Sequence, residues 1–144
     1  MFIDEIFHFT LSTIAGLAVG YFTQNYYAII FALLSGFFID ADHFIDYFSY
    51  TKFRRFSLRE FKSSMYFEYA GKVYILFHGF EYSILFVILG IVYPQLGWLF
   101  YSFGISNLLH LIYDTVYNKP IWPTYFLSFR IAKKFDHKTF DFKK

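Results

Sequence analysis

The sequence predicts an all-α membrane protein that forms a single domain over residues 1–144 and crosses the bilayer four times. Three observations predict this fold: an apolar and aromatic composition, two long uncharged runs, and the segregation of Lys and Arg into two blocks. Apolar residues make up 57% of the chain, Phe, Tyr and Trp 27%, and charged residues only 17%. So few charges would barely cover the surface of a soluble domain, although a soluble helical bundle with an overfilled core is the alternative.

Composition excludes two other classes, and the charge pattern indicates a membrane topology. A chain this apolar has too much surface to bury for intrinsic disorder, and without cysteine it is no disulfide scaffold. Residues 1–48 and 73–118 carry acids but no Lys or Arg, whereas residues 49–72 and 119–144 are basic. Basic segments beside apolar ones are typical of the cytoplasmic side of a membrane protein.

The first apolar block predicts two transmembrane helices, over about 7–22 and 27–45. No Asp, Glu, Lys or Arg occurs from Ile6 to Ile39, a run of 34 residues. One span needs roughly 20 residues, so the run suits two short spans. The polar cluster Thr-Gln-Asn at 23–25 predicts the turn between them.

The second apolar block predicts two further helices, over about 73–92 and 97–117. Glu81 is the only charged residue in this block before its last turns. Pro94 predicts the connecting turn, because proline disfavours helix at its own position and at the residue before it. Both turns are short and uncharged, whereas both long connections are basic.

The loop 49–72 and the tail 118–144 are predicted to lie at the cytoplasmic surface, together with the N-terminus. KFRRFSLREFK at 52–62 and YFLSFRIAKKF at 125–135 interleave Phe with Arg and Lys, as do segments that lie among lipid headgroups. Simple anchoring of the spans is the alternative to a role in substrate handling. We expect membrane lipids as partners in a bacterial cytoplasmic membrane, pairing of this small chain into a homo-oligomer, and no nucleic acid.

Ionisable residues within the predicted spans are the functional candidates, because charge inside a bilayer is costly. All lie within roughly 10–12 Å of the predicted cytoplasmic boundary, at a rise of about 1.5 Å per residue. They are His8, Asp40, Asp42, His43, Asp46, His78, Glu81, His110 and Asp114. Their shared depth predicts one common site, with Asp46 as the weakest member because it could face water.

The residue types and their spacing favour a metal site. His110 and Asp114 are four residues apart and share a helix face, as do His78 and Glu81 at a spacing of three. Imidazole with carboxylate suits zinc, with manganese or iron as alternatives. The donors exceed one tetrahedral site, which allows one divalent ion or two ions sharing a carboxylate. Taken alone, each motif is also compatible with a buried hydrogen-bonded pair or a solvated helix end.

Three motifs resemble the YdjM-like family of membrane-bound metal-dependent hydrolases, over most of the chain. His8 precedes an apolar helix that contains Gly16 and Gly20. GFFIDADHFIDYF at 36–48 looks like the family's Asp-x-Asp-His signature. NLLHLIYDTVYNKPIWP at 107–123 is similar to its His-x-x-x-Asp helix, which a Pro/Trp turn follows.

One departure from the family pattern concerns the third helix. The family commonly carries Arg-Gly and Thr-His-Ser there, whereas this chain has FHGFEYS at 77–83, with Glu81 where the family motif has no acid. The family is distantly similar to the helical zinc-dependent phospholipase C and nuclease enzymes. That similarity implies phosphate-ester hydrolysis by analogy.

The sequence thus predicts a metal-dependent phosphoesterase or lipid hydrolase at the cytoplasmic leaflet. The expected metal ligands are Asp42, His78, His110 and Asp114, followed by His8 and His43. Glu81 and Asp40 are the expected catalytic carboxylates, one of which would take a proton from the attacking water. Arg54, Arg55 and Arg59, with Lys62, are expected to hold the phosphate. A structural or sensory metal site without catalysis is the main alternative, and metal-ion transport the weaker one because the outer halves of the spans carry no ionisable group.

Overall fold

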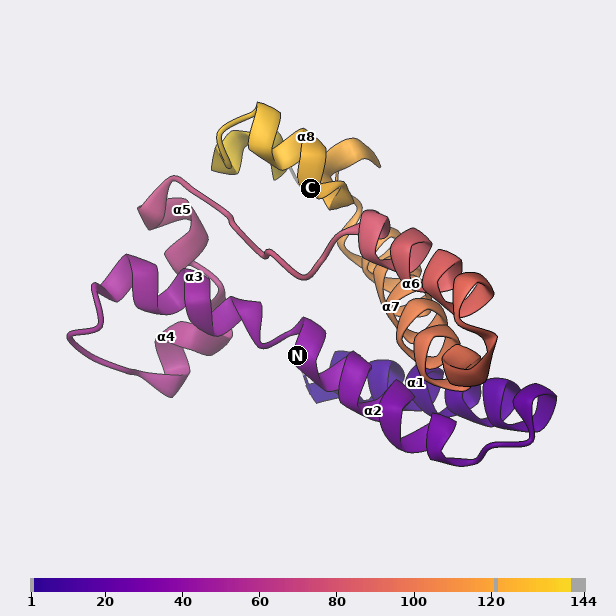
Figure 1. Cartoon of the computed structure of the whole chain (residues 1–144). Helices are drawn as coiled ribbons and strands as arrows, with labels where there is room; N and C mark the ends of the chain where they lie inside the picture. The colour runs from indigo at the N-terminus through magenta and orange to yellow at the C-terminus, as the bar shows by residue number, and fades with distance from the viewer. Residues whose placement is uncertain (1, 121, 141–144) are drawn as a thin grey trace.

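A computed structural model describes residues 2–120 and 122–140, with only the backbone described at 2, 3 and 122. Its regular secondary structure is helical, without a strand among these residues, which confirms the all-α prediction. Two helical hairpins pack together, and shorter helices gather at one end of them (Figure 1). The hairpin helices are α1 (Phe2–Thr23), α2 (Tyr27–Ile39), α6 (Phe80–Val92) and α7 (Gly97–Asn118).

Small residues allow the hairpin helices to approach closely. A Cβ atom at Gly16 of α1 would lie 2.5 Å from the Cα of Ile29 in α2. A Cβ atom at Gly90 of α6 would lie 2.5 Å from the ring of Tyr101 in α7. Contacts of this kind drive helix association where no hydrophobic force acts between helices, as in a bilayer.

Hydrogen bonds between helices add to this packing. Ser106 of α7 donates to the carbonyl of Ala32 in α2 at 2.8 Å, and its oxygen lies 3.0 Å from that of Ser12 in α1. Ser83 of α6 donates to the side chain of Asn107 in α7 at 2.6 Å. Helix α7 therefore lies against the other three helices and fixes their relative positions.

Two helical stretches are long and apolar enough to cross a membrane, Asp4–Thr23 and Tyr27–Thr51. Phe80–Val92 and Pro94–Asn118 add a third if this pair, bent by 119°, forms one span. The predicted turn between them is present, because Pro94 begins the short 3₁₀ helix η1 (Pro94–Leu96). The structure thus supports two or three of the four spans that the sequence predicts as candidates by length and composition.

The helix predicted over 73–92 begins only at Phe80, so the prediction was wrong for residues 73–79. Helix α6 has 13 residues and a length of about 20 Å, well short of the roughly 30 Å hydrocarbon core. Residues 73–79 are not helical because side chains of the preceding helix α3 (Asp42–Thr51) bind their backbone N–H groups. Hydropathy alone does not reveal that these N–H groups bind carboxylates and not the carbonyls of a helix.

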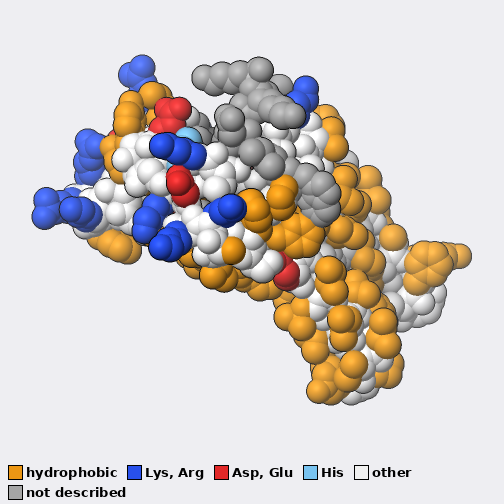
Figure 2. All heavy atoms as spheres, turned by 90° about the horizontal axis from the view of Figure 1, so that it is seen from above, with side chains coloured by type: hydrophobic (Ala, Val, Ile, Leu, Met, Phe, Trp, Pro, Cys, Tyr) orange, Lys and Arg blue, Asp and Glu red, His pale blue; other side chains and the backbone are white. Residues whose placement is uncertain are grey.

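The basic loop and the tail form the end of the molecule at which the hairpins stop. The loop contains α4 (Leu58–Ser63) and α5 (Tyr66–Ala70), and the tail contains η2 (Trp122–Tyr125), α8 (Leu127–Ala132) and η3 (His137–Phe140). Figure 2 shows Lys and Arg side chains gathered over this end and a largely hydrophobic surface over the helices that extend from it. Exposed hydrophobic side chains, among them Phe53 and Phe56, also lie in the basic loop. This distribution is compatible with a membrane protein.

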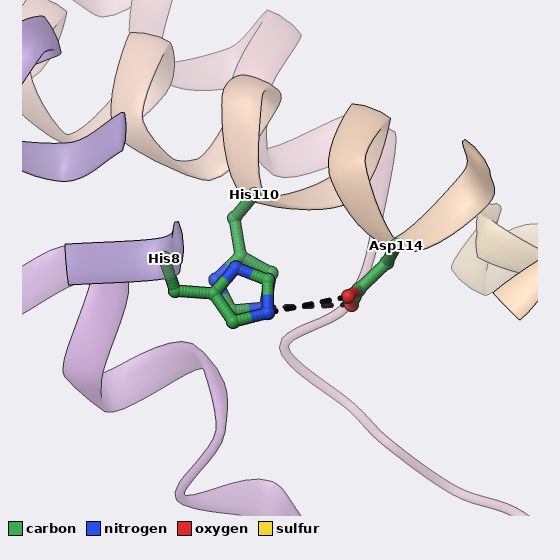
Figure 3. Close-up of side chains that lie close together, drawn as sticks. All are labelled: His8, His110 and Asp114. Atoms are coloured by element: carbon green, nitrogen blue, oxygen red, sulfur yellow. Dashed lines mark ion pairs between the residues drawn. The ribbon is translucent and has the colours of Figure 1, made fainter. Parts of the chain in front are cut away.

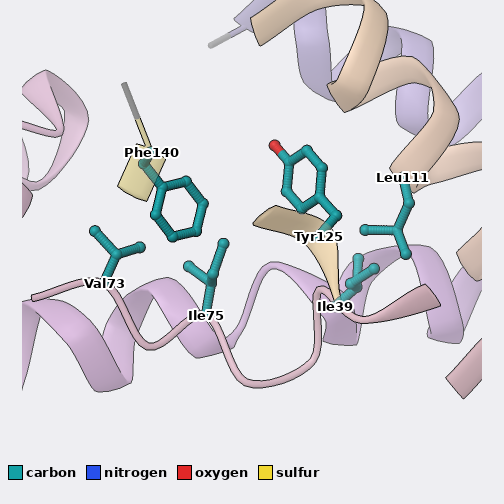
Figure 4. Packing of buried hydrophobic residues seen from close by; sticks show 6 residues of the cluster. All are labelled: Ile39, Val73, Ile75, Leu111, Tyr125 and Phe140. Atoms are coloured by element: carbon teal, nitrogen blue, oxygen red, sulfur yellow. The ribbon is translucent and has the colours of Figure 1, made fainter. Parts of the chain in front are cut away.

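A buried hydrophobic cluster joins this end to the hairpins (Figure 4). It contains side chains from the end of α2, from α7, from the tail and from the non-helical residues 73–79, which are called the extended segment. They are Ile39, Val73, Ile75, Leu111, Tyr125 and Phe140. The tail is therefore packed against the helix ends, where the predicted site residues lie.

Candidate metal centre

Within the described residues, seven His and Asp side chains gather where α1 begins, α2 gives way to α3 and α7 ends. They form three overlapping groups, and in each group one N or O atom per residue lies within 4.8 Å of the others. The groups are His8–His110–Asp114, Asp40–His78–His110 and Asp42–His43–His78. Each group could hold a metal ion, and all seven residues belong to the site predicted from the sequence.

His78 and His110 face the same two carboxylates. Nε2 of His78 lies 3.3 Å from Oδ1 of Asp40 and 3.7 Å from Oδ2 of Asp114. Nε2 of His110 lies 3.5 Å and 3.4 Å from the same two oxygens. Ligand atoms about 2.0–2.2 Å from a tetrahedral ion are separated from one another by about 3.3–3.6 Å. The four His-to-Asp separations in this donor set are therefore close to the ligand separations around a tetrahedral ion.

The surroundings of His110 also fit a bound cation. His110 is 1% exposed, its Nδ1 makes no hydrogen bond, and its Nε2 faces the carboxylates of Asp40 and Asp114. An imidazole nitrogen beside two carboxylates is a combination that zinc sites use. Burial alone would lower the pKa of His78, but the carboxylates of Asp42 and Asp40 outweigh it and hold that pKa well above its ordinary value. The surroundings thus favour positive charge at the point where the carboxylates meet.

Asp114 is placed to serve two histidine-lined sites at once. Its Oδ2 faces His78 and His110, whereas its Oδ1 lies 3.3 Å from Nε2 of His8 (Figure 3). The rings of His8 and His110 stack, with centroids 3.7 Å apart and planes 11° from parallel. Both oxygens of one carboxylate thus face imidazoles from different helices, the arrangement of a carboxylate that bridges two ions.

Asp42 supports His78 in the structure. It is not one of the four residues Asp40, His78, His110 and Asp114 that form the donor set. It is 0% exposed, and its Oδ2 accepts the backbone N–H of Phe77 at 2.6 Å and lies 3.1 Å from Nδ1 of His78. A proton on Nδ1 would be held by this oxygen, which fixes the ring and leaves Nε2 free for a metal. Asp42 belongs to one of the three groups that could hold a metal ion, and its hydrogen bond also orients His78.

His43 lies at the open edge of the cluster. Its Nε2 is 3.6 Å from Oδ1 of Asp40, and its side chain is 31% exposed. Its ring meets that of His78 edge-on, with centroids 5.1 Å apart. His43 is therefore close enough to assist a ligand or a substrate, but it is less enclosed than His78 and His110.

Asp46 anchors the extended segment that carries His78. Its two oxygens accept the backbone N–H groups of Tyr74 at 2.7 Å and Ile75 at 2.8 Å, and the residue is 3% exposed. The expectation that Asp46 could face water was therefore wrong. Its carboxylate replaces the helical hydrogen bonds that this segment lacks.

Arg130 also holds the extended segment 73–79, through its backbone carbonyl groups. Sequence reasoning did not identify this residue. It is 0% exposed and donates to the carbonyls of Ile75 at 3.0 Å, His78 at 2.8 Å and Thr124 at 2.9 Å. In the sequence, Arg130 is the only arginine among the seven cations of residues 119–144, but its spacing does not indicate its partners. Two of its three partners lie 52 and 55 residues away, so only the folded chain reveals these contacts.

A cavity of about 840 Å³ opens beside the cluster. Five cluster residues line it: His8, Asp40, His43, His78 and Asp114. A structural metal site is closed on all sides by protein ligands, whereas a catalytic site keeps one position open. The donor set therefore faces a space that can admit water and a substrate.

Comparison of the chain with protein-family models, with curated proteins and with solved structures found no match. The resemblance to the YdjM-like family accordingly rests on the motifs alone.

Asp4 and Glu5 also line the cavity, and sequence reasoning did not assign them to the site. Both lie about one turn before His8 on α1. Their spacing of four and three residues from His8 was the available signal, because it places them on the same helix face. Two further carboxylates thus border the open side of the metal centre.

The three arginines that were expected to hold a phosphate do not line this cavity. Arg54 and Arg59 are exposed, and Arg55 makes an ion pair with Glu60 at 2.9 Å. Lys62, on the same short helix as Arg59, does line the cavity. Of the four cations expected to hold the phosphate, Lys62 is the one that lines the cavity.

Glu81 lies outside the cluster and outside the cavity lining. Its carboxylate accepts the backbone N–H groups of Leu127 and Ser128, each at 2.9 Å, and the hydroxyl of Ser128 at 2.8 Å. These are the first residues of α8, whose free N–H groups need acceptors. Glu81, expected as a ligand or general base, instead caps the helix that carries Arg130.

Replacing Glu81 with alanine should therefore reduce stability and leave bound metal unchanged. Loss of a helix cap costs about 1 kcal/mol. Thermal unfolding followed by circular dichroism would show a lower transition, while elemental analysis would find the wild-type metal content. Glu68→Ala is the matched control, because Glu68 is exposed and caps nothing. Metal loss in a folded Glu81→Ala protein would contradict the capping role.

Proposed function

We propose that this protein is a membrane-embedded, metal-dependent phosphoesterase that cleaves a lipid or membrane-associated phosphate ester at the cytoplasmic face of a bacterial cytoplasmic membrane. The observation that carries the proposal is the donor set of His78, His110, Asp40 and Asp114 beside an open cavity. The apolar helices support the membrane location. The motif resemblance to the YdjM-like hydrolases supports the reaction class.

The residues of the site have separate roles in this proposal. A divalent ion held by the donor set would supply Lewis acidity for a phosphoryl oxygen and a water of lowered pKa. Asp40 is our candidate for the general base, because its ion pairs all involve Oδ1 and it lines the cavity. Its Oδ2 is then available to accept a proton within hydrogen-bond reach. Asp42 keeps the ring of His78 aligned.

Zinc is the proposed metal, with manganese and iron as alternatives. Two imidazoles together with two carboxylates are donors that suit zinc best. A second ion is proposed near His8, where Oδ1 of Asp114 would be one of its ligands. The first ion would then use the other oxygen of Asp114. The carboxylates of Asp4 and Glu5 favour the binding of a second ion, because they raise the negative charge beside His8.

A structural or sensory metal site without catalysis is the alternative. The near-complete burial of His78 and His110 favours it. The cavity favours catalysis, because five of the cluster residues face open space. The two hypotheses differ in whether the bound metal turns over a substrate.

The test is hydrolysis by purified protein loaded with zinc, manganese or iron in chelator-free detergent. Release of phosphate or of the headgroup would be measured over a panel of lipid phosphate esters, with soluble phosphate esters as a comparison. We expect metal-dependent turnover of at least one lipid ester and its loss in Asp40→Asn. Stoichiometric metal without hydrolysis of any ester in the panel would contradict the enzymatic function and favour the structural one.

A further inference from the structure

The large cavity beside the metal centre has room for more than the reacting phosphate. We propose, on the basis of the phosphoesterase function above, that it binds the hydrocarbon chain of a lipid phosphate ester, which enters sideways from the bilayer, and that Lys62 contacts the phosphate. The source of the ligand is thus a membrane lipid and not a soluble phosphate ester. Four features of the cavity support this.

Volume and lining are the first two features. Pockets of about 300–1,000 Å³ enclose drug-sized ligands, and the cavity of about 840 Å³ lies in that range. Apart from its polar side chains, its walls are aromatic and aliphatic. They include Phe44, Phe61, Tyr66, Phe67, Val73 and Ile75. A phosphate alone would leave most of this apolar surface uncovered, whereas an alkyl chain would cover it.

The third feature is that two side chains of the cavity lining are also exposed on the apolar stretch Tyr27–Thr51. Phe37 of α2 is 74% exposed and belongs to the stretch Tyr27–Thr51, which is apolar enough to cross a membrane. The same side chain lines the cavity, as does Phe44, which is 43% exposed. Side chains that border both the bilayer-facing surface and the cavity mark a lateral entrance. A lipid could insert its chain there without leaving the membrane.

The fourth feature is the charge of the lining. Lys62 is the only Lys or Arg among the described residues that line the cavity. The acids are more numerous: Asp4, Glu5, Asp40, Glu68 and Asp114. Without a metal this cavity would repel an anion, so phosphate binding should require the metal. Lys62 is then the side chain placed to add a charge-assisted hydrogen bond.

Alkylphosphonates test the chain site without hydrolysis, because their C–P bond is not cleaved by a phosphoesterase. Ethylphosphonate and dodecylphosphonate would be titrated calorimetrically into metal-loaded protein in amphipol, since a detergent chain could occupy the cavity. We expect dodecylphosphonate to bind at least about tenfold tighter, because burying two methylene groups is worth roughly that factor. Removal of the metal should abolish binding of the phosphonate head. Equal affinity for the two compounds would overturn the chain site.

Two matched pairs of variants locate the contacts. Lys62→Ala should weaken dodecylphosphonate binding roughly three- to tenfold, and Arg59→Ala, on the same helix but outside the cavity, should not change it. Met65→Trp would narrow the cavity and should remove most of the chain-length preference, whereas Leu58→Trp, also at an exposed position, should keep it. Equal losses in Lys62→Ala and Arg59→Ala would exclude the specific role of Lys62.

This test separates the inference from the proposed function. Chain-dependent binding without hydrolysis of dodecyl phosphate would support the lipid site and contradict the phosphoesterase. Hydrolysis with no preference for the longer chain would support the phosphoesterase and overturn the lipid site. Metal content, measured in each variant, shows whether the metal centre is intact in every comparison.

Discussion

Replacing His110 with alanine is expected to abolish stoichiometric metal binding while the helical fold remains. Its Nε2 faces the carboxylates of Asp40 and Asp114 within the donor set, and its Nδ1 makes no hydrogen bond that the substitution would remove. Elemental analysis after purification in chelator-free detergent would measure the metal, and circular dichroism the helix content. The affinity loss should exceed the roughly 10- to 100-fold that loss of a supporting carboxylate costs.

His137→Ala is the matched control for this experiment. His137 lines the same cavity but lies outside the His/Asp groups, so its removal should leave metal content unchanged. Asp42→Asn should give an intermediate result, because Asp42 orients His78 and lies outside the donor set. Unchanged metal content in both His110→Ala and Asp42→Asn would refute the metal centre described above.

Replacing Arg130 with methionine is expected to produce the largest loss of stability. Methionine keeps much of the apolar stem but leaves the carbonyls of Ile75, His78 and Thr124 without their buried donor. Unsatisfied buried groups of this kind cost about 1–3 kcal/mol each, so a loss of about 3 kcal/mol or more is expected. Thermal unfolding in detergent, with metal removed, would measure it.

The metal-binding consequence of this variant can be measured separately. Because Arg130 holds the carbonyl of His78, its loss should also weaken metal binding under conditions where the protein stays folded. Arg59→Met is the control, since Arg59 is exposed and outside the cavity lining. Equal unfolding temperatures for the two variants would show that Arg130 is dispensable for the extended segment.

Sequence reasoning was most informative where the signal was local. The i,i+4 spacing of His110 and Asp114 and the Asp-x-Asp-His run at 40–43 indicated which side chains share a helix face or a turn. A shared depth in the predicted spans then indicated that these segments meet. The structure does bring those side chains together, with His8 and His78. The prediction needed only the positions of the residues along helices.

It failed where the deciding partner is remote in the sequence. Residues 73–79 are apolar and read as the start of a helix, but Asp42 and Asp46 bind their N–H groups from 28 to 35 residues away. Glu81 has suitable chemistry for catalysis and lies close to His78, but its acceptor role is set by α8, 46 residues later. Neither hydropathy nor spacing contains information on such pairings.

The order of Arg130 and the metal-site residues along the chain has a consequence for biosynthesis. All seven His and Asp residues of the candidate metal centre precede residue 115, so they leave the ribosome before Arg130 does. Until α8 is made, the carbonyls of Ile75 and His78 lack the donor that holds them. A nascent chain thus carries every ligand before it can hold His78 in place, so stable metal uptake should come only after α8 has been made.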